Sequence, residues 1–164
     1  MPNTFELIAS STVGAGGAAS IDFTSIPSTY TDLVIKFSGS ATSSGGWVNI
    51  TFNGSSANLS GKYIYANNGS VASGSIAPLM YSNPTSYTAN TFGNGETYIP
   101  NYAGSNYKSM SIDTVNENNA TASDMLLQAS LWSNTAAINR ITLTPNAGNL
   151  AQYSTAYLYG VKNA

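Results

Sequence analysis

Carboxylates are the side chains of this sequence that could support acid–base chemistry. The chain has seven Asp and Glu residues, and cleavage of a glycosidic bond needs two of them facing one cleft. Asp113 and Glu117 are the closest suggestive pair, and the Asn carbonyls between and after them could join a calcium shell. The spacing is not that of an EF-hand, and a strand end running into a polar turn explains the segment better. A glycan hydrolase using Asp113 or Glu117 remains a minor alternative.

Histidine and cysteine, which supply most familiar enzyme chemistry, are both absent. Their absence excludes Ser-His-Asp and Cys-His nucleophiles, His-ligated catalytic metals, zinc fingers and disulfides. We therefore predict a protein that is not an enzyme, with no catalytic residue, no cofactor and no metal site.

A glycine-rich segment at residues 14–19 fits the dinucleotide-binding pattern GxGxx[G/A], with Asp32 at a suitable distance. That motif needs a helix to follow it, so that the helix N-terminus can receive the pyrophosphate. Here residues 21–23 alternate between apolar and polar side chains and Pro27 follows. The segment is therefore predicted to be a hairpin connection between strands.

Aromatic side chains are the remaining chemical resource, because the chain has 11 tyrosines and two tryptophans. Tyr98, Tyr102 and Tyr107 crowd around residues 100–104. A tyrosine ring suits both sugar stacking and protein contacts, since it combines a large apolar surface with a polar tip. We predict Tyr98, Tyr102, Tyr107 and Trp47 as interface residues.

The elements that must position these side chains are strands, because short runs alternate apolar and polar residues between Gly, Asn, Ser and Pro clusters. Five runs each place their apolar members on one predicted half-buried face: Leu33, Ile35 and Phe37; Val48, Ile50 and Phe52; Met125, Leu127, Ala129 and Leu131; Ile141 and Leu143; and Tyr157, Tyr159 and Val161. Weaker strands are predicted at residues 5–9, 19–23, 62–66, 70–79, 96–100 and 109–115. Residues 120–128 are the best helix candidate, although they read more naturally as strand.

Many short strands predict an all-β fold, an antiparallel two-sheet sandwich of jelly-roll type with about 8–11 strands and little helix. Neither a repeat nor a linker interrupts the sequence, so residues 1–164 are predicted to form a single β-sandwich domain. The first residues lack the basic region and apolar block of a signal peptide. No apolar run approaches the roughly 18 residues needed to span a bilayer.

Charge is unusually scarce, since only 7% of the residues are Asp, Glu, Lys or Arg and the net charge is −2. An ordinary soluble protein carries about 25% charged residues. Without a basic patch, binding to nucleic acid is not expected, and neither is binding to a membrane. A neutral, hydroxyl-rich surface without an export signal suggests a protein made in a host cytoplasm and released by lysis, as part of a virus.

Four stretches carry a resemblance to a known group: SIPSTYTDLV at residues 25–34, YIPNY at 98–102, WSNTAAI at 132–138 and STAYLYGV at 154–161. Together they resemble small virion structural proteins of tailed bacteriophages, over roughly residues 21–161. The resemblance implies a capsid decoration (cement) subunit or a part of a tail fibre, and neither role has a catalytic motif to carry over.

The first functional hypothesis is a decoration protein on the outer surface of the virion. It would assemble as a homotrimer and bind the major capsid protein. The second is a tail-fibre or receptor-binding module whose exposed rings stack on host carbohydrate.

Overall fold

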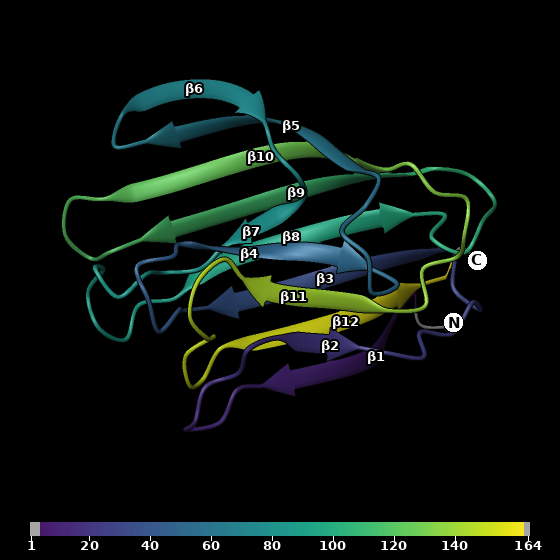
Figure 1. Ribbon diagram of the computed structural model, residues 1–164, viewed down its shortest axis with the longest axis horizontal. Helices are drawn as coiled ribbons and strands as arrows, with labels where there is room; N and C mark the ends of the chain where they lie inside the picture. Colours follow the sequence, from purple (N-terminus) through teal and green to yellow (C-terminus); the bar gives the residue numbers. More distant parts are fainter. Residues whose placement is uncertain (1–3, 163–164) are drawn as a thin grey trace.

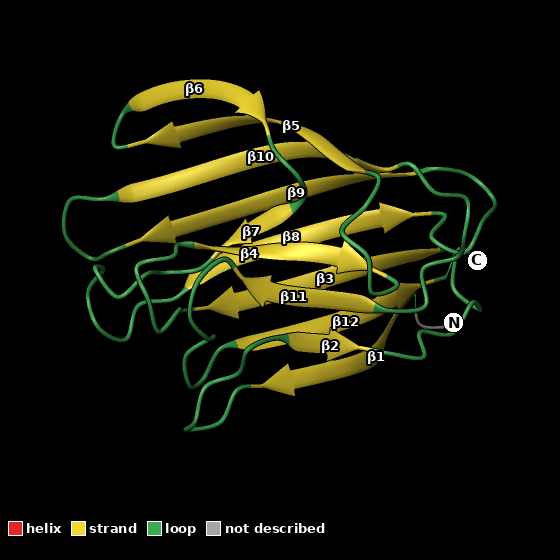
Figure 2. Cartoon of the chain, in the orientation of Figure 1, coloured by secondary structure: helices red, strands yellow, loops and turns green. Residues whose placement is uncertain are grey.

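The computed structural model describes residues 4–162, and this part of the chain contains 12 strands and no helix (Figure 2). The strands are β1 (Phe5–Thr12), β2 (Ile21–Phe23), β3 (Asp32–Gly39), β4 (Trp47–Phe52), β5 (Leu59–Asn67), β6 (Ser70–Ser75), β7 (Leu79–Tyr81), β8 (Gly93–Pro100), β9 (Lys108–Glu117), β10 (Ser123–Trp132), β11 (Ile141–Pro145) and β12 (Thr155–Val161). The ends of the predicted domain, residues 1–3 and 163–164, lie outside the described residues. Within residues 4–162, no helix is long and apolar enough to cross a membrane.

Two antiparallel sheets pack into a sandwich, which confirms the predicted fold class. The large sheet has eight strands in the order β1-β12-β3-β8-β9-β10-β5-β6, and the small sheet has four in the order β2-β11-β4-β7. The 12 strands slightly exceed the predicted 8–11. The segment considered for a helix, residues 120–128, runs into β10 instead.

The strand pairs are nested, as expected for a jelly roll. Along the chain, the β5–β6 hairpin is flanked by the paired strands β4 and β7, and these in turn by β3 and β10. The paired strands β2 and β11 come next, and the paired strands β1 and β12 are outermost. One departure from this pattern is the β8–β9 hairpin, which is inserted between β3 and β10. The insertion widens the large sheet and pushes β10, β5 and β6 away from β3.

The widened sheet extends beyond the small one. Figure 1 shows the small sheet in front of the β1 to β9 part of the large sheet, with β10, β5 and β6 at the top beyond it. We call these three strands the overhang. Because the small sheet does not extend over it, the inner side chains Tyr63 and Tyr65 of β5 are only half-buried, whereas the inward side chains of β3 are buried.

The core lies between the sheets, and three predicted apolar faces are confirmed there. Inward side chains of β3, β4 and β11 are buried: Leu33, Ile35, Phe37, Val48, Ile50, Phe52, Ile141 and Leu143. Burying each such side chain contributes about 1.5–3 kcal/mol. The Phe52 and Trp132 rings meet at a centroid distance of 5.5 Å, which joins β4 to the last residue of β10.

The predicted faces of β10 and β12 are wrong. In β10 the inward residues are Leu126, Gln128, Ser130 and Trp132, while Met125 and Leu127 are exposed. In β12 the inward residues are Ala156, Leu158 and Gly160, with Tyr157 and Tyr159 outside; Val161, the third member of the predicted face, is buried at the end of the strand. The register with the neighbouring strands decides which face is inward, and a one-residue change exchanges the two faces.

Gln128 explains how a polar side chain replaces an apolar one inside β10. Its Nε2 donates hydrogen bonds of 3.1 and 3.0 Å to the carbonyls of Ile76 and Ala77, and its Oε1 accepts a 3.3 Å bond from the Leu79 N–H. The buried amide therefore holds the link between β6 and β7. This link breaks the strand predicted at residues 70–79 into two.

Lys108 is another buried polar side chain that organises its surroundings. Its Nζ donates to the carbonyls of Gly104, Asn106 and Asn134 at 2.7, 2.7 and 3.2 Å and lies 5.7 Å from the centre of the Trp132 ring. All three ammonium donors are thus used. Burial lowers the pKa of Lys108, and the bonds tie two loops to the start of β9.

Asn and Gly residues that adopt positive φ angles determine where the chain reverses direction. Asn68 and Gly69, with φ of 47° and 87°, form the two-residue turn of the β5–β6 hairpin, as a primed turn requires. The glycine-rich segment also forms a turn, with the Gly17 N–H bonded to the Gly14 carbonyl. The predicted hairpin there is wrong, because β1 and β2 lie in different sheets.

Candidate functional site

The outer face of the overhang is the largest departure from an ordinary protein surface. We call the exposed apolar side chains of this face and of the adjacent β9 the outer patch: Ile64, Val71, Val115, Met125 and Leu127. Four of the five are 60–73% exposed. Pairing places Val71, Ala66, Met125 and Val115 in one row across β6, β5, β10 and β9, with Ile64 and Leu127 in the next row. A contiguous exposed apolar patch of this kind marks an interaction site.

A trough runs along this face. Cavities of about 330 Å³ and 520 Å³ lie over the outer patch and share Ile64 and Leu127. The second meets a larger one of about 680 Å³ at Lys62 and Ala129. The outer patch is therefore the apolar part of a longer hollow.

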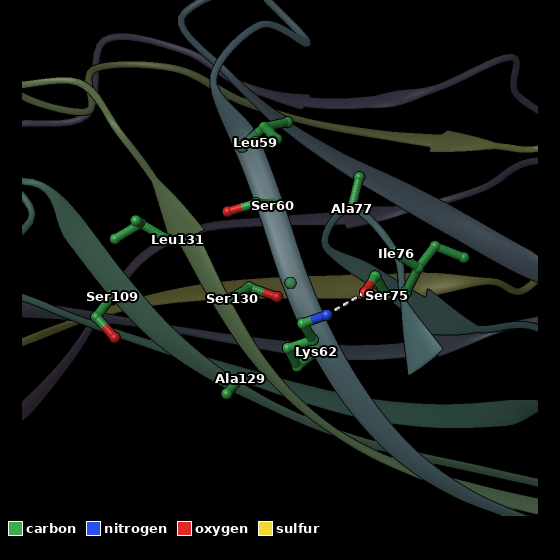
Figure 3. Close-up of a pocket in the computed structure, with 11 residues that line it drawn as sticks. Leu59, Ser60, Lys62, Ser75, Ile76, Ala77, Ser109, Ala129, Ser130 and Leu131 are labelled. Atoms are coloured by element: carbon green, nitrogen blue, oxygen red, sulfur yellow. Dashed lines mark hydrogen bonds between the residues drawn. The ribbon is translucent and has the colours of Figure 1, made fainter. Parts of the chain in front are cut away.

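Small hydroxyl side chains line the larger cavity. Figure 3 shows Lys62 bonded to Ser75, with Ser60 on the same strand as Lys62, Ser130 on β10 and Ser109 on β9. Lys62 is the only titratable side chain among the described residues that line it. A lone lysine without an acid or a nucleophile partner provides a hydrogen-bond donor and a charge, which suits contact with another molecule.

Asp113 and Glu117 are not arranged as a glycosidase pair. Both are exposed on the outer face of β9, four residues apart, so their Cα atoms are about 13 Å apart. Hydrolases place the two carboxyl groups roughly 5–9.5 Å apart around one bond. Glu117 also turns toward the β9–β10 connection, where its Oε1 accepts a 2.7 Å bond from the Asn119 N–H. The intervening Asn116 faces inward, so the segment does not converge on a cation.

A second hollow lies where the inner face of β5 meets the edge of the small sheet. We call it the aromatic groove: a cavity of about 170 Å³ lined by Trp47, Tyr63, Tyr65, Ile76, Leu79, Tyr81 and Leu126. Trp47 and Tyr81 are cross-strand partners on β4 and β7. Tyr63 and Tyr65 share the inner face of β5, with ring centroids 5.7 Å apart at 60°. Rings from two sheets thus converge on one hollow.

Two further polar side chains stand beside the aromatic groove. The Asp124 carboxylate accepts a 2.8 Å bond from the Tyr87 hydroxyl and a second bond from the Asn67 amide. Burial, and then the charge of Asp124, raises the pKa of Tyr81 to about 12. Burial and the bond to Asp124 raise the pKa of Tyr87 to about 12. Both phenols therefore stay neutral under physiological conditions.

The four predicted interface residues have different fates. Trp47 is 39% exposed at the rim of the aromatic groove. Tyr98 is 37% exposed on the outer face of β8, where its hydroxyl donates a 2.7 Å bond to Asp32, a bond that raises the pKa of Tyr98. Tyr107 is 57% exposed in the loop before β9. These three are available to a partner.

Tyr102 requires a correction, because its side chain is fully buried. It belongs to the core cluster, and its hydroxyl donates to the Pro27 carbonyl. Asn101, with a φ of 51°, turns the chain directly before it and so directs the ring inward. Tyr102 therefore holds the loop after β8 and is not a surface residue.

Sequence reasoning missed Tyr63, Tyr65 and Tyr81. Tyr63 and Tyr65 alternate with Ile64, which already predicts that the two rings share a face. The convergence of that face with Trp47 and Tyr81 depends on pairings between distant strands, so no local signal contains it.

No group of three or more potential metal-binding side chains occurs within residues 4–162. No protein family model matches the chain, and no curated protein and no solved structure is similar to it.

Proposed function

We propose that this chain is a non-enzymatic structural protein of a virus particle, a capsid decoration (cement) protein that assembles on the outer surface of the head. The observation that carries the proposal is the uncovered outer patch. The scarcity of charge and the resemblance to phage virion proteins support the same role.

The outer patch supports assembly because regularly alternating apolar residues on one face of a strand are typical of a face that another part of a protein covers. Met125, Leu127, Ala129 and Leu131 form the more apolar face of β10, yet the isolated chain leaves that face open. Covering it with another protein would remove apolar surface from water, at roughly 25 cal/mol per Å². Full conversion of area into affinity is not expected, because association also costs rotational and side-chain freedom.

A second copy of this chain is the occupant that the charges favour. Lys62 and Asp113 flank the outer patch on opposite sides, on β5 and β9. Neither takes part in a salt bridge within residues 4–162. Copies related by a rotation axis can place Lys62 of one beside Asp113 of the next, which sets orientation more than affinity. A closed ring of three copies satisfies this arrangement.

Binding to an expanded shell supplies the physical role. A subunit that binds one state of the capsid stabilises that state by mass action. A ring of copies seated on the major capsid protein would hold neighbouring shell subunits together. No turnover of substrate is involved.

Oligomeric state is the first test. Sedimentation of the purified chain should reveal a trimer, and Leu127→Lys should raise the concentration needed for assembly at least tenfold. Tyr153→Asn is the matched control, because Tyr153 is equally exposed on another surface and its φ of 70° suits Asn. Wild-type assembly of Leu127→Lys, or a monomer at every concentration, would contradict the assignment of this surface.

Salt is the second test of the same contact. Between about 0.01 and 1 M ionic strength the Debye length falls from about 30 to 3 Å. Since the contact is mainly apolar, assembly should change little over this range. A steep loss of assembly with added salt would instead indicate a charge-driven contact.

Position on the particle is the third test. An antibody against the purified chain, applied to intact virions from the producing cells, should label the surface of the head in electron micrographs. Label on tail fibres would favour the alternative role, and an absence of label from finished particles would refute a virion protein.

Carbohydrate recognition by a tail-fibre or receptor-binding module is the second candidate function. The specific observation in its favour is the convergence of Trp47, Tyr63, Tyr65 and Tyr81 on one groove. Selective binding on a glycan array would support it, whereas shell occupancy without glycan binding would support decoration alone.

A further inference from the structure

The aromatic groove has the shape of a site for one ring. Its volume is about 170 Å³, below the roughly 300–1,000 Å³ of clefts that enclose drug-sized molecules. Leu79 and Leu126 form an apolar floor, and Ile76 closes one side. Trp47 at the rim is partly exposed, so a longer ligand can continue out of the groove along its indole.

The ring faces are held in place by the strands that carry them. Tyr63 pairs with Gly74 of β6, and a Cβ atom at position 74 would lie 2.6 Å from the Tyr63 hydroxyl. Glycine therefore makes room for the Tyr63 ring to lie across β6. Gln128 fixes the β6–β7 link and with it the position of Tyr81. The groove is preformed, which reduces the entropy lost on binding.

Four hydrogen-bonding groups in the groove lack a protein partner. Within residues 4–162, no group bonds the hydroxyls of Tyr63, Tyr65 or Tyr81, or the indole N–H of Trp47. Three hydroxyls that both donate and accept, and one donor, thus surround an apolar floor. A ligand that presents an apolar face to the rings and hydroxyls at its edge satisfies all of them.

The charge near the groove is negative and small. Asp124 has no salt bridge within the described chain, and each of its oxygens accepts one bond from Tyr87 or Asn67. Each carboxylate oxygen retains capacity to accept another bond. No Lys or Arg lines the groove, so an anionic ligand would meet a carboxylate without a counter-charge.

We propose that the aromatic groove binds one pyranose ring of a neutral glycan. The sugar stacks its C–H face between the β5 tyrosines and Trp47, and its hydroxyls bond the tyrosine hydroxyls and Asp124. This inference deepens the second candidate function by naming its site and ligand class. It involves the opposite face of the overhang from the outer patch, so the two sites can be tested separately.

A quaternary ammonium ligand is the competing chemistry, because aromatic cages beside a carboxylate also bind such cations. An ammonium without N–H groups offers no hydrogen bond to the three tyrosine hydroxyls or the Trp47 N–H, which would bond only to water. The unpaired donors therefore favour the sugar.

The direct test is titration of the full chain with neutral oligosaccharides of glucose, galactose, mannose and N-acetylglucosamine, and with choline chloride. The chain has two tryptophans, of which Trp47 is exposed and Trp132 is buried. A saturable fluorescence change on sugar addition, confirmed by calorimetry, is the expected result.

Variants assign the signal to the groove. Tyr65→Ala should weaken sugar binding more than tenfold, and Tyr81→Phe, which keeps the ring and removes the hydroxyl, should weaken it about threefold to tenfold. Tyr107→Ala is the matched control, since it removes an exposed tyrosine elsewhere and should bind as wild type. Asp124→Asn separates the chemistries, because it should abolish choline binding but reduce sugar binding only severalfold.

The outcomes decide between the two proposals. Binding of choline without binding of any sugar, wild-type affinity in Tyr81→Phe and Tyr65→Ala, or no binding by any sugar in the panel would each overturn the glycan site. Sedimentation of the same variants distinguishes this from failure of the decoration role, because groove variants should assemble as wild type and Leu127→Lys should still bind sugar.

Discussion

The covered part of the large sheet and the overhang show opposite uses of the same alternating strands. In β3 the apolar face is buried under the small sheet, and the outer face carries the Lys36–Glu96 ion pair with β8. In the overhang the outer face carries exposed apolar residues, and the inner face carries half-buried tyrosines and Gln128 beside the buried Leu126 and Trp132. One sheet thus combines a stabilising region with a region whose surfaces are available for binding.

The largest difference in stability should appear when a large apolar side chain is truncated in each of the two regions. Ile112→Ala in β9, where the side chain is fully buried, should lower the free energy of unfolding by about 2–5 kcal/mol. Leu127→Ala in the neighbouring strand, measured at a concentration too low for assembly, should change it by less than about 0.5 kcal/mol. Urea unfolding measures both, and similar losses in the two variants would remove the distinction between the regions.

The next largest loss of stability should come from replacing Lys108, which holds two loops against the covered part of the sandwich. Lys108→Met preserves much of the side-chain volume but leaves three carbonyls without their donor. Because buried unpaired polar groups are costly, we expect a loss of about 1–3 kcal/mol in thermal or urea unfolding. Lys36→Met, in the exposed ion pair, is the control and should cost far less.

The dependence of stability on alkaline pH tests whether the phenols near the inner face of the overhang are protected from water. The pKa values of Tyr81 and Tyr87 are raised from 10.0 to about 12, so the unfolded chain loses these protons first. Their contribution to stability is complete below pH 10 and is lost as the pH rises toward 12. The double variant Tyr81→Phe and Tyr87→Phe should show a smaller loss across this window. An unchanged alkaline profile would show that the groove phenols are not protected.

The smallest effect is expected at the edge of the small sheet. A bond from Thr142 and the contact with Arg140 lower the pKa of Asp22 below 3.8. Its contribution is therefore present above pH 3.8 and is lost as the pH falls through the lowered pKa. Asp22→Asn should cost about 0.5 kcal/mol at neutral pH, because the pair is partly exposed, and should flatten the acid limb of the stability curve.

Sequence patterns predicted the strands well but not which face of each strand is covered. For β3, β4 and β11 only one face is strongly apolar, so the alternation of apolar and polar residues was sufficient to predict which face is buried. For β10 both faces carry large apolar residues, Leu126 and Trp132 on one and Met125 and Leu127 on the other. The inward choice depends on Gln128 finding backbone partners 49–52 residues away, which no local pattern contains.

The candidate site was predictable in residue type and not in position. Tyrosine abundance pointed to surface rings, and Tyr98 and Tyr107 are exposed, but Tyr102, between them in sequence, is buried after the turn at Asn101. The aromatic groove needs β4, β5 and β7 to meet, and their contacts join residues from distant parts of the chain. Composition therefore identified the chemistry, and topology determined where it gathers.

The nested strand pairs have a consequence for synthesis. Because β1 pairs with β12, β1 leaves the ribosome long before its partner does, while the β5–β6 hairpin can close early through its local Asn68-Gly69 turn. Non-local pairing of this kind makes folding slow and leaves unfinished chains with open edges. The β5–β6 hairpin can therefore form before β12 completes the large sheet, and incomplete chains that meet at this stage can pair through open strand edges.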